Sequence, residues 1–510
     1  MNDKKVRVRF APSPTGPLHI GGVRTALFNY LFAKKYNGYF ILRIEDTDQT
    51  RYVKGAEEYI IESLEWCGIK FNEGVSVGGS HAPYRQSERK EIYKKFAEQL
   101  IKSNHAYYAF DTAEELDNKR KEYEKNKATF QYNSNTRLSM KNSLSMADEE
   151  VCNNINEEVP YVIRIKVPEN ENIEFNDIIR QKVIFNSSQV DDKVLYKSDG
   201  MPTYHLANVV DDYLMQISHV IRGEEWLSST PIHVLLYRYL GIENNMPEFA
   251  HLPLLLKPDG KGKLSKRDGD KLGFPVFPLK WVDPNTNEIS SGYRESGYFP
   301  ESFINFLTFL GWNPGTTQEL FTLDELVEAF SLEKVGKSGS KFDFEKAKWF
   351  NHQYLIMKTD EELCNLFMPI LKEKNIDVCY DYVTKVCSIL KERVNFVNEF
   401  WNQGYYFFIQ PQEYDSKIIK DKWKENTPVI LNEIIKLLIS SEDFCSKPLE
   451  ETVKNYLHSQ NLNIGQIMSA IRISLVGTAI GPGVFEIAEI IGKNETIERL
   501  KKAIKEIKIS

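Results

Sequence analysis

The sequence contains no long hydrophobic run. No stretch of about 18 consecutive apolar residues occurs in its 510 residues, so a membrane-spanning helix is not expected. The first ten residues, MNDKKVRVRF, also lack the apolar centre of a secretory signal peptide. We therefore expect a soluble, cytoplasmic protein that has no membrane partner.

Cysteine is scarce and its spacing predicts no site. The chain has six cysteines, and none of them forms a CxxC or CxC pair. Neither a thiolate zinc site nor a disulfide framework is therefore predicted. Reduced thiols are the expected state in the cytoplasm.

An excess of positive charge is absent as well. The chain has 65 Lys and Arg against 72 Asp and Glu, so its formal net charge is −7. This excludes a uniformly basic coat for nucleic acid, but not a basic face on part of the surface. No repeat of fixed period occurs, and at roughly 100–200 residues per domain the length predicts three to four domains.

The N-terminal segment has the pattern of a strand, a helix and a second strand. Residues 5–10 alternate basic and apolar side chains, a helix is expected over residues 22–36, and residues 39–44 are apolar like a buried parallel strand. Such a unit favours an α/β fold with a doubly wound parallel sheet, whose ligands bind beyond the carboxyl ends of its strands. Arg9 and Glu45 fall near those ends.

The rest of the chain predicts an insertion followed by a helical C-terminal region. Residues 126–156 are rich in Asn, Ser and Lys with weak periodicity, which indicates a mobile insertion. Further helices are expected over 54–68, 88–103, 303–310, 323–330, 361–372, 382–400, 429–439 and 464–475, and further strands over 161–167, 182–185 and 194–197. The expected divisions are 1–105 and 199–260 for the two halves of the sheet domain, 106–198 for an α+β insertion, 261–345 for a loop with helices, and 346–510 for an all-α region.

Two segments have the composition of phosphate-binding loops. Residues 17–22 read Pro-Leu-His-Ile-Gly-Gly before the first helix, where backbone N–H groups bind phosphate and glycines permit close approach. Residues 262–267 read Gly-Lys-Leu-Ser-Lys-Arg, and Lys263 and Lys266 could neutralise a triphosphate. Taken singly, the first segment is more often only a turn and the second only a solvated basic loop.

Together, these two segments resemble the two signatures of class I aminoacyl-tRNA synthetases. Five further segments are similar to bacterial glutamyl-tRNA synthetases: 9–16, 43–48, 84–89, 204–212 and 220–226. Gly22 stands where the class often has His, and Leu264 where Met is common. Some relatives hold zinc in the insertion, but residues 104–135 contain no cysteine, so no structural zinc is expected here.

The resemblance implies a glutamate–tRNA ligase with a Rossmann-like catalytic domain. Glutamate would react with ATP, accompanied by Mg²⁺, to give glutamyl-adenylate and pyrophosphate, and would then pass to the terminal ribose of tRNA(Glu). The insertion would meet the acceptor stem and residues 346–510 the anticodon. A monomer is expected.

The resemblance also implies roles for individual residues. The glutamate site would comprise Arg9, Ser13, Glu45, Tyr204, Asn208 and Arg222. The ATP site would comprise Ala11, His19, Gly21, Gly22, Glu225, Trp226, Leu264, Ser265 and Lys266, with His19, Lys263 and Lys266 as the catalytic groups. Arg9 would grip the side-chain carboxylate and Arg222 the α-carboxylate, since a guanidinium fork suits a planar anion.

Each assignment has a simpler alternative. Arg9 could be a solvated edge-strand arginine, Tyr204 a core aromatic, and Asp46 and Asp48 structural. Structural roles are also expected for His205, His219, His233, His251 and the aromatic run 405–408.

Other functions are open on the sequence alone. The enzyme could also charge tRNA(Gln), or be a glutaminyl-tRNA synthetase, although the helical pattern after residue 340 is unlike that enzyme's β-barrel region. A short enzyme that glutamylates a modified tRNA base lacks an anticodon domain, which this length argues against. An inactive RNA-binding relative would not need the paired motifs, and a generic nucleotidyl transferase would not need the amino-acid pocket.

Overall fold

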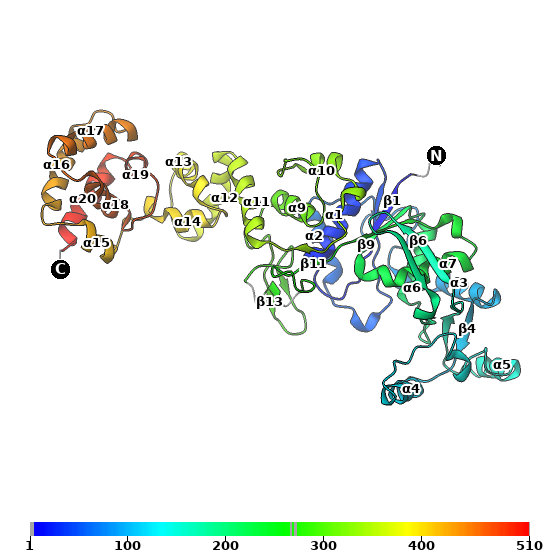
Figure 1. Ribbon diagram of the computed structural model, residues 1–510. Coiled ribbons are helices and arrows are strands. Elements are labelled where there is room, and N and C mark those ends of the chain that lie inside the picture. The colour runs from blue at the N-terminus through cyan, green and yellow to red at the C-terminus, as the bar shows by residue number, and fades with distance from the viewer. Residues whose placement is uncertain (1–4, 266–267, 270–272, 509–510) are drawn as a thin grey trace. The chain divides into compact units, whose positions relative to one another are not determined.

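The computed structural model describes residues 5–265, 268–269 and 273–508. The chain divides into two compact units, Met1–Ala347 and Lys348–Ser510 (Figure 1). The first is an α/β unit built on parallel strands, and the second is helical. Both agree with the fold class predicted from the sequence. No helix in the described ranges is long and apolar enough to cross a membrane.

The predicted N-terminal strand, helix and strand are present. β1 (Arg7–Phe10), α1 (Ile20–Lys35) and β2 (Tyr39–Leu42) follow in order, and β3 (Glu73–Gly74) extends the sheet. β1 pairs with β2 and β2 with β3, both in parallel, with Arg9 opposite Ile41. Because β1 and β2 end at the same edge, the segments that follow them meet there.

A second group of strands completes this layer. β9 (His219–Gly223) and β10 (Glu248–Leu252) are parallel, β6 (Asn172–Asp177) is parallel to β10, and β7 (Gln181–Asn186) is antiparallel to β6. The backbone N–H of Ser218, just before β9, donates to the carbonyl of Arg7 at 2.8 Å, which joins the two groups. α1 spans the join, since Asn29 donates to the carbonyl of Ile221 at 3.1 Å.

The insertion has a smaller sheet of its own. β4 (Ala106–Ala109), β5 (Val162–Ile165) and β8 (Val194–Tyr196) are antiparallel, and α4 (Ala113–Lys125) begins with a capping box formed by Thr112 and Glu115. The hairpin of β6 and β7 also lies within the expected insertion range. It pairs with β10 rather than with this sheet, so residues 172–186 extend the larger one.

The prediction that residues 126–156 form a mobile insertion is wrong. They contain a 3₁₀ turn, Arg137–Ser139, and α5 (Asp148–Asn156), and the side chains of Tyr132 and Met140 are buried. The segment is organised around Asn142, which is fully buried and donates to the Tyr132 hydroxyl at 3.0 Å. A core built on a polar side chain leaves little apolar periodicity in the sequence.

The remaining elements of the first unit surround the sheets. β11 (Leu255–Leu256) pairs in parallel with β14 (Ser340–Lys341), which anchors the segment that leads into the second signature. The others are α2 (Ala56–Trp66), α3 (Lys90–Lys102), α6 (Tyr204–Leu214), α7 (Thr230–Tyr239), β12 (Trp281–Val282), β13 (Ile289–Ser290), α9 (Pro300–Phe309) and α10 (Leu323–Ala329).

The C-terminal helices confirm most of the predicted helical segments, with one exception. The predicted helix over 382–400 is wrong: α13 (Tyr380–Leu390) ends there, and a separate α14 (Glu399–Gly404) follows. The Glu399 carboxylate accepts the backbone N–H of Asn395 at 2.7 Å, and this local bond favours a new helix start over a continuous one. The other helices are α11 (Phe344–Met357), α12 (Asp360–Glu373), α15 (Ser416–Lys422), α16 (Thr427–Ser440), α17 (Ser446–Ser459), α18 (Ile464–Val476), α19 (Val484–Ile491) and α20 (Lys493–Glu506).

Candidate active site

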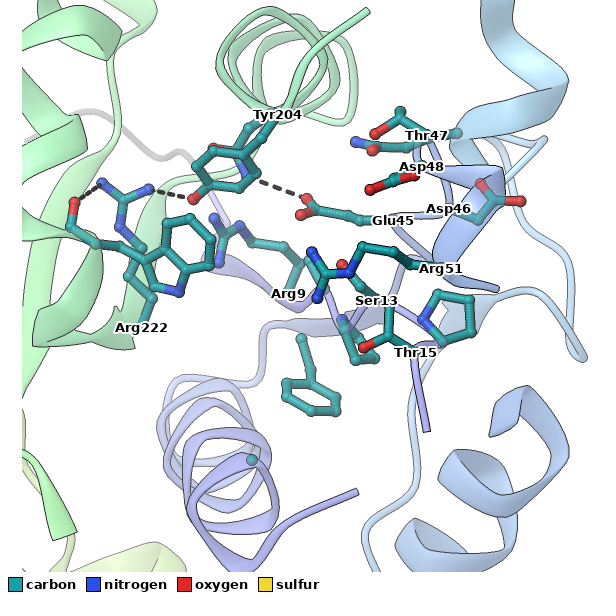
Figure 2. A pocket seen from close by; sticks show the side chains of 18 of the residues that line it. Arg9, Ser13, Thr15, Glu45, Asp46, Thr47, Asp48, Arg51, Tyr204 and Arg222 are labelled. Carbon is teal, nitrogen blue, oxygen red and sulfur yellow. Dashed lines mark hydrogen bonds between the residues drawn. The ribbon is translucent and has the colours of Figure 1, made fainter. Parts of the chain in front are cut away.

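A pocket lies where the parallel strands end. Its volume is about 650 Å³, and its lining comes from the segments after β1 and β2, from the start of α6 and from the end of β9. In Figure 2, Arg9, Ser13 and Glu45 enter from the N-terminal elements in blue, while Tyr204 and Arg222 enter from the later elements in green. The sheet thus brings together residues from both ends of the first unit.

Arg9 is buried in the pocket wall and is paired. Its Nε donates to Asp212 Oδ1 at 3.1 Å and its Nη2 to Asp212 Oδ2 at 3.2 Å. With 3% exposure, the residue is not a solvated edge-strand arginine. A guanidinium has five N–H donors in a fork, so this pairing leaves the Nη1 edge to the pocket.

Glu45 is the anion of the same end of the pocket. Its Oε1 accepts from Arg43 Nη2 at 3.0 Å and from Asn208 Nδ2 at 3.1 Å. Burial raises the pKa of the Glu45 carboxyl above its ordinary value, and the charges of Arg43 and Arg9 oppose that rise without cancelling it. Asn208 therefore shares the pocket with Glu45, one helical turn after Tyr204.

Arg222 is held by neutral groups. Its Nη1 donates to the Tyr204 hydroxyl at 2.8 Å, its Nη2 to Thr230 Oγ1 at 2.9 Å and its Nε to His251 Nε2 at 3.0 Å. His251 Nδ1 lies 2.6 Å from Asp177 Oδ2, and burial lowers the pKa of His251 to about 4. A neutral imidazole that donates to Asp177 leaves its other nitrogen to accept from Arg222.

The surroundings of Arg222 leave its charge available. Arg222 is buried, with only 5% of its surface exposed. Over the ranges that the structure describes, no carboxylate lies within ion-pair distance of its guanidinium group. Tyr204 also packs on Trp226, with ring centroids 4.4 Å apart. Tyr204 is therefore part of the pocket wall as well as an aromatic packing group.

The other end of the pocket begins at α1. His19 is the N-cap of this helix, and its Nδ1 accepts the backbone N–H of Gly21 at 3.2 Å. A Cβ on Gly22 would lie 2.5 Å from the side chain of Leu18, so a larger residue there would require that side chain to move. Gly21 and Gly22 line the pocket and allow a ligand to approach the helix start.

The second signature is anchored on one side and exposed on the other. Leu264 is buried, and its backbone N–H donates to the carbonyl of Leu255 at 2.8 Å. Ser265 donates to Asp268 through both its backbone N–H and its hydroxyl, at 2.8 and 2.6 Å. Lys263 Nζ lies 2.8 Å from Glu225 Oε1, in an exposed pair.

The predicted site residues fall into three groups. Those that line the pocket are Arg9, Ala11, Ser13, Gly21, Gly22, Glu45, Tyr204, Asn208, Arg222, Glu225 and Trp226. Those outside its lining are His19, Lys263, Leu264 and Ser265. Lys266 lies outside the described residues.

Sequence reasoning missed the buried partners of the pocket residues. Arg43 contacts Glu45 and Asp212 contacts Arg9, and both lie within segments 43–48 and 204–212, where the family resemblance assigns roles to other residues. It also missed Lys197 and Arg51 at the pocket rim. Asp46 lines the pocket as well, while its carboxylate accepts the backbone N–H of Ser87 at 2.8 Å.

Comparison with known proteins finds related sequences along nearly the whole chain. Residues 5–349 match the family described as tRNA synthetases class I (E and Q), catalytic domain, and residues 362–504 match an anticodon binding domain. The glutamate–tRNA ligase of Parabacteroides distasonis is 57% identical over 100% of both chains, and that of Flavobacterium johnsoniae is 58% identical over 98% of this chain and 99% of the other.

A solved structure agrees in three dimensions. The crystal structure of a glutamate tRNA ligase from Elizabethkingia meningosepticum, in complex with its amino acid, has a TM-score of 0.96 and 52% identity over 99% of this chain and 100% of that chain. Both the sequence and the fold therefore match over the full length. The chain belongs to the class I tRNA synthetases of the E and Q group.

Proposed function

We propose that the protein is a glutamate–tRNA ligase. The observation that supports this most directly is the charge at the buried end of the pocket, where the guanidinium groups of Arg9 and Arg222 and the carboxylate of Glu45 are among the lining groups. Glutamate carries two carboxylates and one ammonium, so its charges complement those three groups one for one. The relatives with this name support the same activity.

Each charge of glutamate has a partner in this proposal. Arg9 takes the side-chain carboxylate through the edge that Asp212 leaves open. Arg222 takes the α-carboxylate, because its other partners are neutral. Glu45 receives the ammonium, since a buried cation needs an anion nearby. Ser13, Tyr204 and Asn208 complete the site.

ATP occupies the other end of the pocket. The N-terminus of α1, with His19, Gly21 and Gly22, accepts phosphate, and Trp226 packs beside the adenine. Lys263 and Lys266 neutralise the triphosphate, which arrives with Mg²⁺ as part of the substrate. Ala11, Glu225, Leu264 and Ser265 shape this end.

The chemistry is a pair of displacements. An α-carboxylate oxygen of glutamate attacks the α-phosphorus of ATP, the bond to the β-phosphate oxygen breaks, and pyrophosphate leaves. A hydroxyl of the terminal ribose of tRNA(Glu) then attacks the acyl carbon, loses its proton, and AMP leaves. Neither step needs a covalent enzyme intermediate, so the side chains act by positioning and by offsetting charge.

Glutamate is favoured over glutamine in this pocket. A glutamine side chain would leave the buried Arg9 without its second anion, a loss of about 1–3 kcal/mol.

The amino-acid pocket does not determine which tRNA is charged, so charging of tRNA(Gln) with glutamate is the second candidate activity. We propose a cytoplasmic monomer whose helical unit, which matches an anticodon binding domain, binds tRNA.

Amino-acid-dependent exchange of pyrophosphate into ATP tests the proposal. The assay uses the full chain with glutamate or glutamine, and with no tRNA, tRNA(Glu) or tRNA(Gln). Exchange that requires glutamate supports it, and exchange with glutamine alone would refute it. Binding of tRNA without any exchange would instead indicate an inactive relative. Charging of both tRNAs with glutamate would establish the second candidate activity.

A further inference from the structure

Behind the pocket lies a chain of buried charges that touches both recognition groups. Arg43 is fully buried, and its Nη1 donates to Asp212 Oδ1 at 2.8 Å while its Nη2 donates to Glu45 Oε1 at 3.0 Å. Asp212 in turn holds Arg9 through both of its oxygens. The order of contact is therefore Arg9, Asp212, Arg43 and Glu45, with alternating charge.

The alternation of charge prevents a direct ion pair between Arg9 and Glu45. Arg9 and Glu45 carry opposite charges within one small buried space, where an ion pair between them would be strong. If they paired with each other, Arg9 would no longer be available to bind a substrate carboxylate, and Glu45 would no longer be available to bind a substrate ammonium. With Asp212 on Arg9 and Arg43 on Glu45, each recognition group already has a partner behind it and turns its remaining edge to the pocket.

We propose that Asp212 and Arg43 are positioning residues that set the selectivity for glutamate by keeping Arg9 and Glu45 apart and oriented. This inference rests on the proposed function, since it concerns how that substrate is recognised. Arg43 acts through Glu45 and Asp212 acts through Arg9, and neither of them lines the pocket. The orientation of the Arg9 side chain is therefore set by Asp212, which lies 203 positions later in the chain.

The neighbouring residue Asp211 provides a matched control. It is as buried as Asp212 and lies on the same helix, α6. Its hydrogen bonds come from Arg89 Nε at 2.8 Å, from Gln86 Nε2 at 2.9 Å and from the Tyr93 hydroxyl at 2.8 Å, and of these three residues only Gln86 lines the pocket. Asp211 Oδ2 also lies 3.8 Å from Arg43 Nε, a longer ion pair without a hydrogen bond. Asp211→Asn therefore removes an equivalent buried charge that contacts neither Arg9 nor Glu45 and that meets the chain of charges only through this longer pair.

The test compares Asp212→Asn, Arg43→Lys and Asp211→Asn in the exchange assay, with thermal unfolding measured alongside. Asp212→Asn keeps the shape of the side chain but loses the charge and one oxygen of the fork on Arg9. We expect it to raise the KM for glutamate about tenfold or more and to lower the ratio of kcat/KM for glutamate over glutamine by a similar factor. The KM for ATP should change by less than about twofold, because the nucleotide end does not contact this chain of charges.

Arg43→Lys keeps the charge, but its single ammonium cannot serve both Asp212 and Glu45 as a fork does. Arg43→Lys should therefore also raise the KM for glutamate. If Asp212→Asn does not fold, this variant still tests the inference. Asp211→Asn should lower the unfolding temperature and leave both the KM and the ratio unchanged.

Three results would overturn the inference while leaving the proposed function intact. They are an unchanged glutamate-to-glutamine ratio in both folded variants, an equal change in Asp211→Asn, and a lower KM for glutamate in Asp212→Asn. The last would mean that Asp212 merely weakens the positive field of Arg9. Failure of the unaltered enzyme to catalyse glutamate-dependent exchange would instead refute the proposed function.

Discussion

The two ends of the pocket are built in different ways. At the amino-acid end, Arg9, Glu45 and their partners are buried, and each is held by an ion pair while Arg9 and Glu45 keep one edge toward the pocket. At the nucleotide end, the contacts come from a helix N-terminus, two glycines and a loop whose Lys263 and Glu225 form an exposed pair. One end is buried and charged, whereas the other is more exposed and built largely from backbone.

This difference matches what each end has to recognise. Selecting glutamate over glutamine requires donors and acceptors that cannot relax toward the wrong ligand, and buried, mutually held charges provide this. A triphosphate changes its charge distribution during the reaction, so groups that follow it must be able to move. Substitutions should therefore affect selectivity at the first end and rate at the second.

The largest expected effect is on the nucleotide side. Lys266→Ala should lower the rate of adenylate formation about 100-fold or more, because a cation that offsets charge developing on the phosphates is lost. Affinity for tRNA, measured by filter binding, should change by less than about twofold. Lys261→Ala removes a lysine from the same loop outside the motif and serves as the control. Equal losses of rate and tRNA affinity would make the loop a docking surface instead.

A smaller effect, confined to selectivity, is expected at the amino-acid end. Arg9→Ala should raise the KM for glutamate about 10- to 100-fold and erode discrimination against glutamine, since the carboxylate loses its cation. Arg7→Ala is the matched control: it lies on the same strand and pairs with Glu73 at 2.9 Å, away from the pocket. If both variants keep the same ratio of kcat/KM values, Arg9 has no part in specificity.

The two ends also differ in how far the sequence predicts them. The elements that end at the pocket could be predicted, because alternation in residues 5–10 and the Gly-rich turn before α1 are local signals. The chain of buried charges could not. Arg43 and Asp212 are 169 positions apart, and no periodic pattern reports which charged residues will meet across a sheet.

The same limit explains the errors elsewhere. Residues 126–156 have a core centred on the polar side chain of Asn142, and the helix predicted over 382–400 is interrupted just before Glu399, whose carboxylate accepts the backbone N–H of Asn395. Hydrophobic periodicity detects neither of these hydrogen bonds. The core interpretation of Tyr406 and Phe407 is confirmed, since bulky aromatic side chains in a helical unit are usually buried.

Acid should destabilise the folded chain through His251, which accepts a hydrogen bond from Arg222 in the pocket. Burial lowers the pKa of this histidine to about 4, whereas an unfolded histidine titrates near 6.5. Between these two values the unfolded chain binds a proton that the folded chain does not, so the free energy of unfolding falls as the pH falls, by about 1.4 kcal/mol per pH unit for this group.

Chemical denaturation at several pH values measures this slope. His251→Gln should flatten it between pH 6.5 and 4, while His458→Gln, at an exposed position on α17, should leave it unchanged. An unaltered slope in His251→Gln would assign the acid sensitivity to other groups.

The smallest effect separates the two ends most directly. The side chains of Lys263 and Glu225 are 55% and 41% exposed, so their ion pair contributes less than about 1 kcal/mol to stability. Glu225→Gln should therefore leave the unfolding temperature nearly unchanged. Because it releases Lys263 toward the phosphates, the KM for ATP should fall about two- to threefold and the KM for glutamate should stay the same. Breaking a pair at the amino-acid end impairs binding, whereas breaking this one should improve it. A higher KM for ATP would show that Glu225 binds the nucleotide itself, and the loop would then be as preorganised as the pocket beside it.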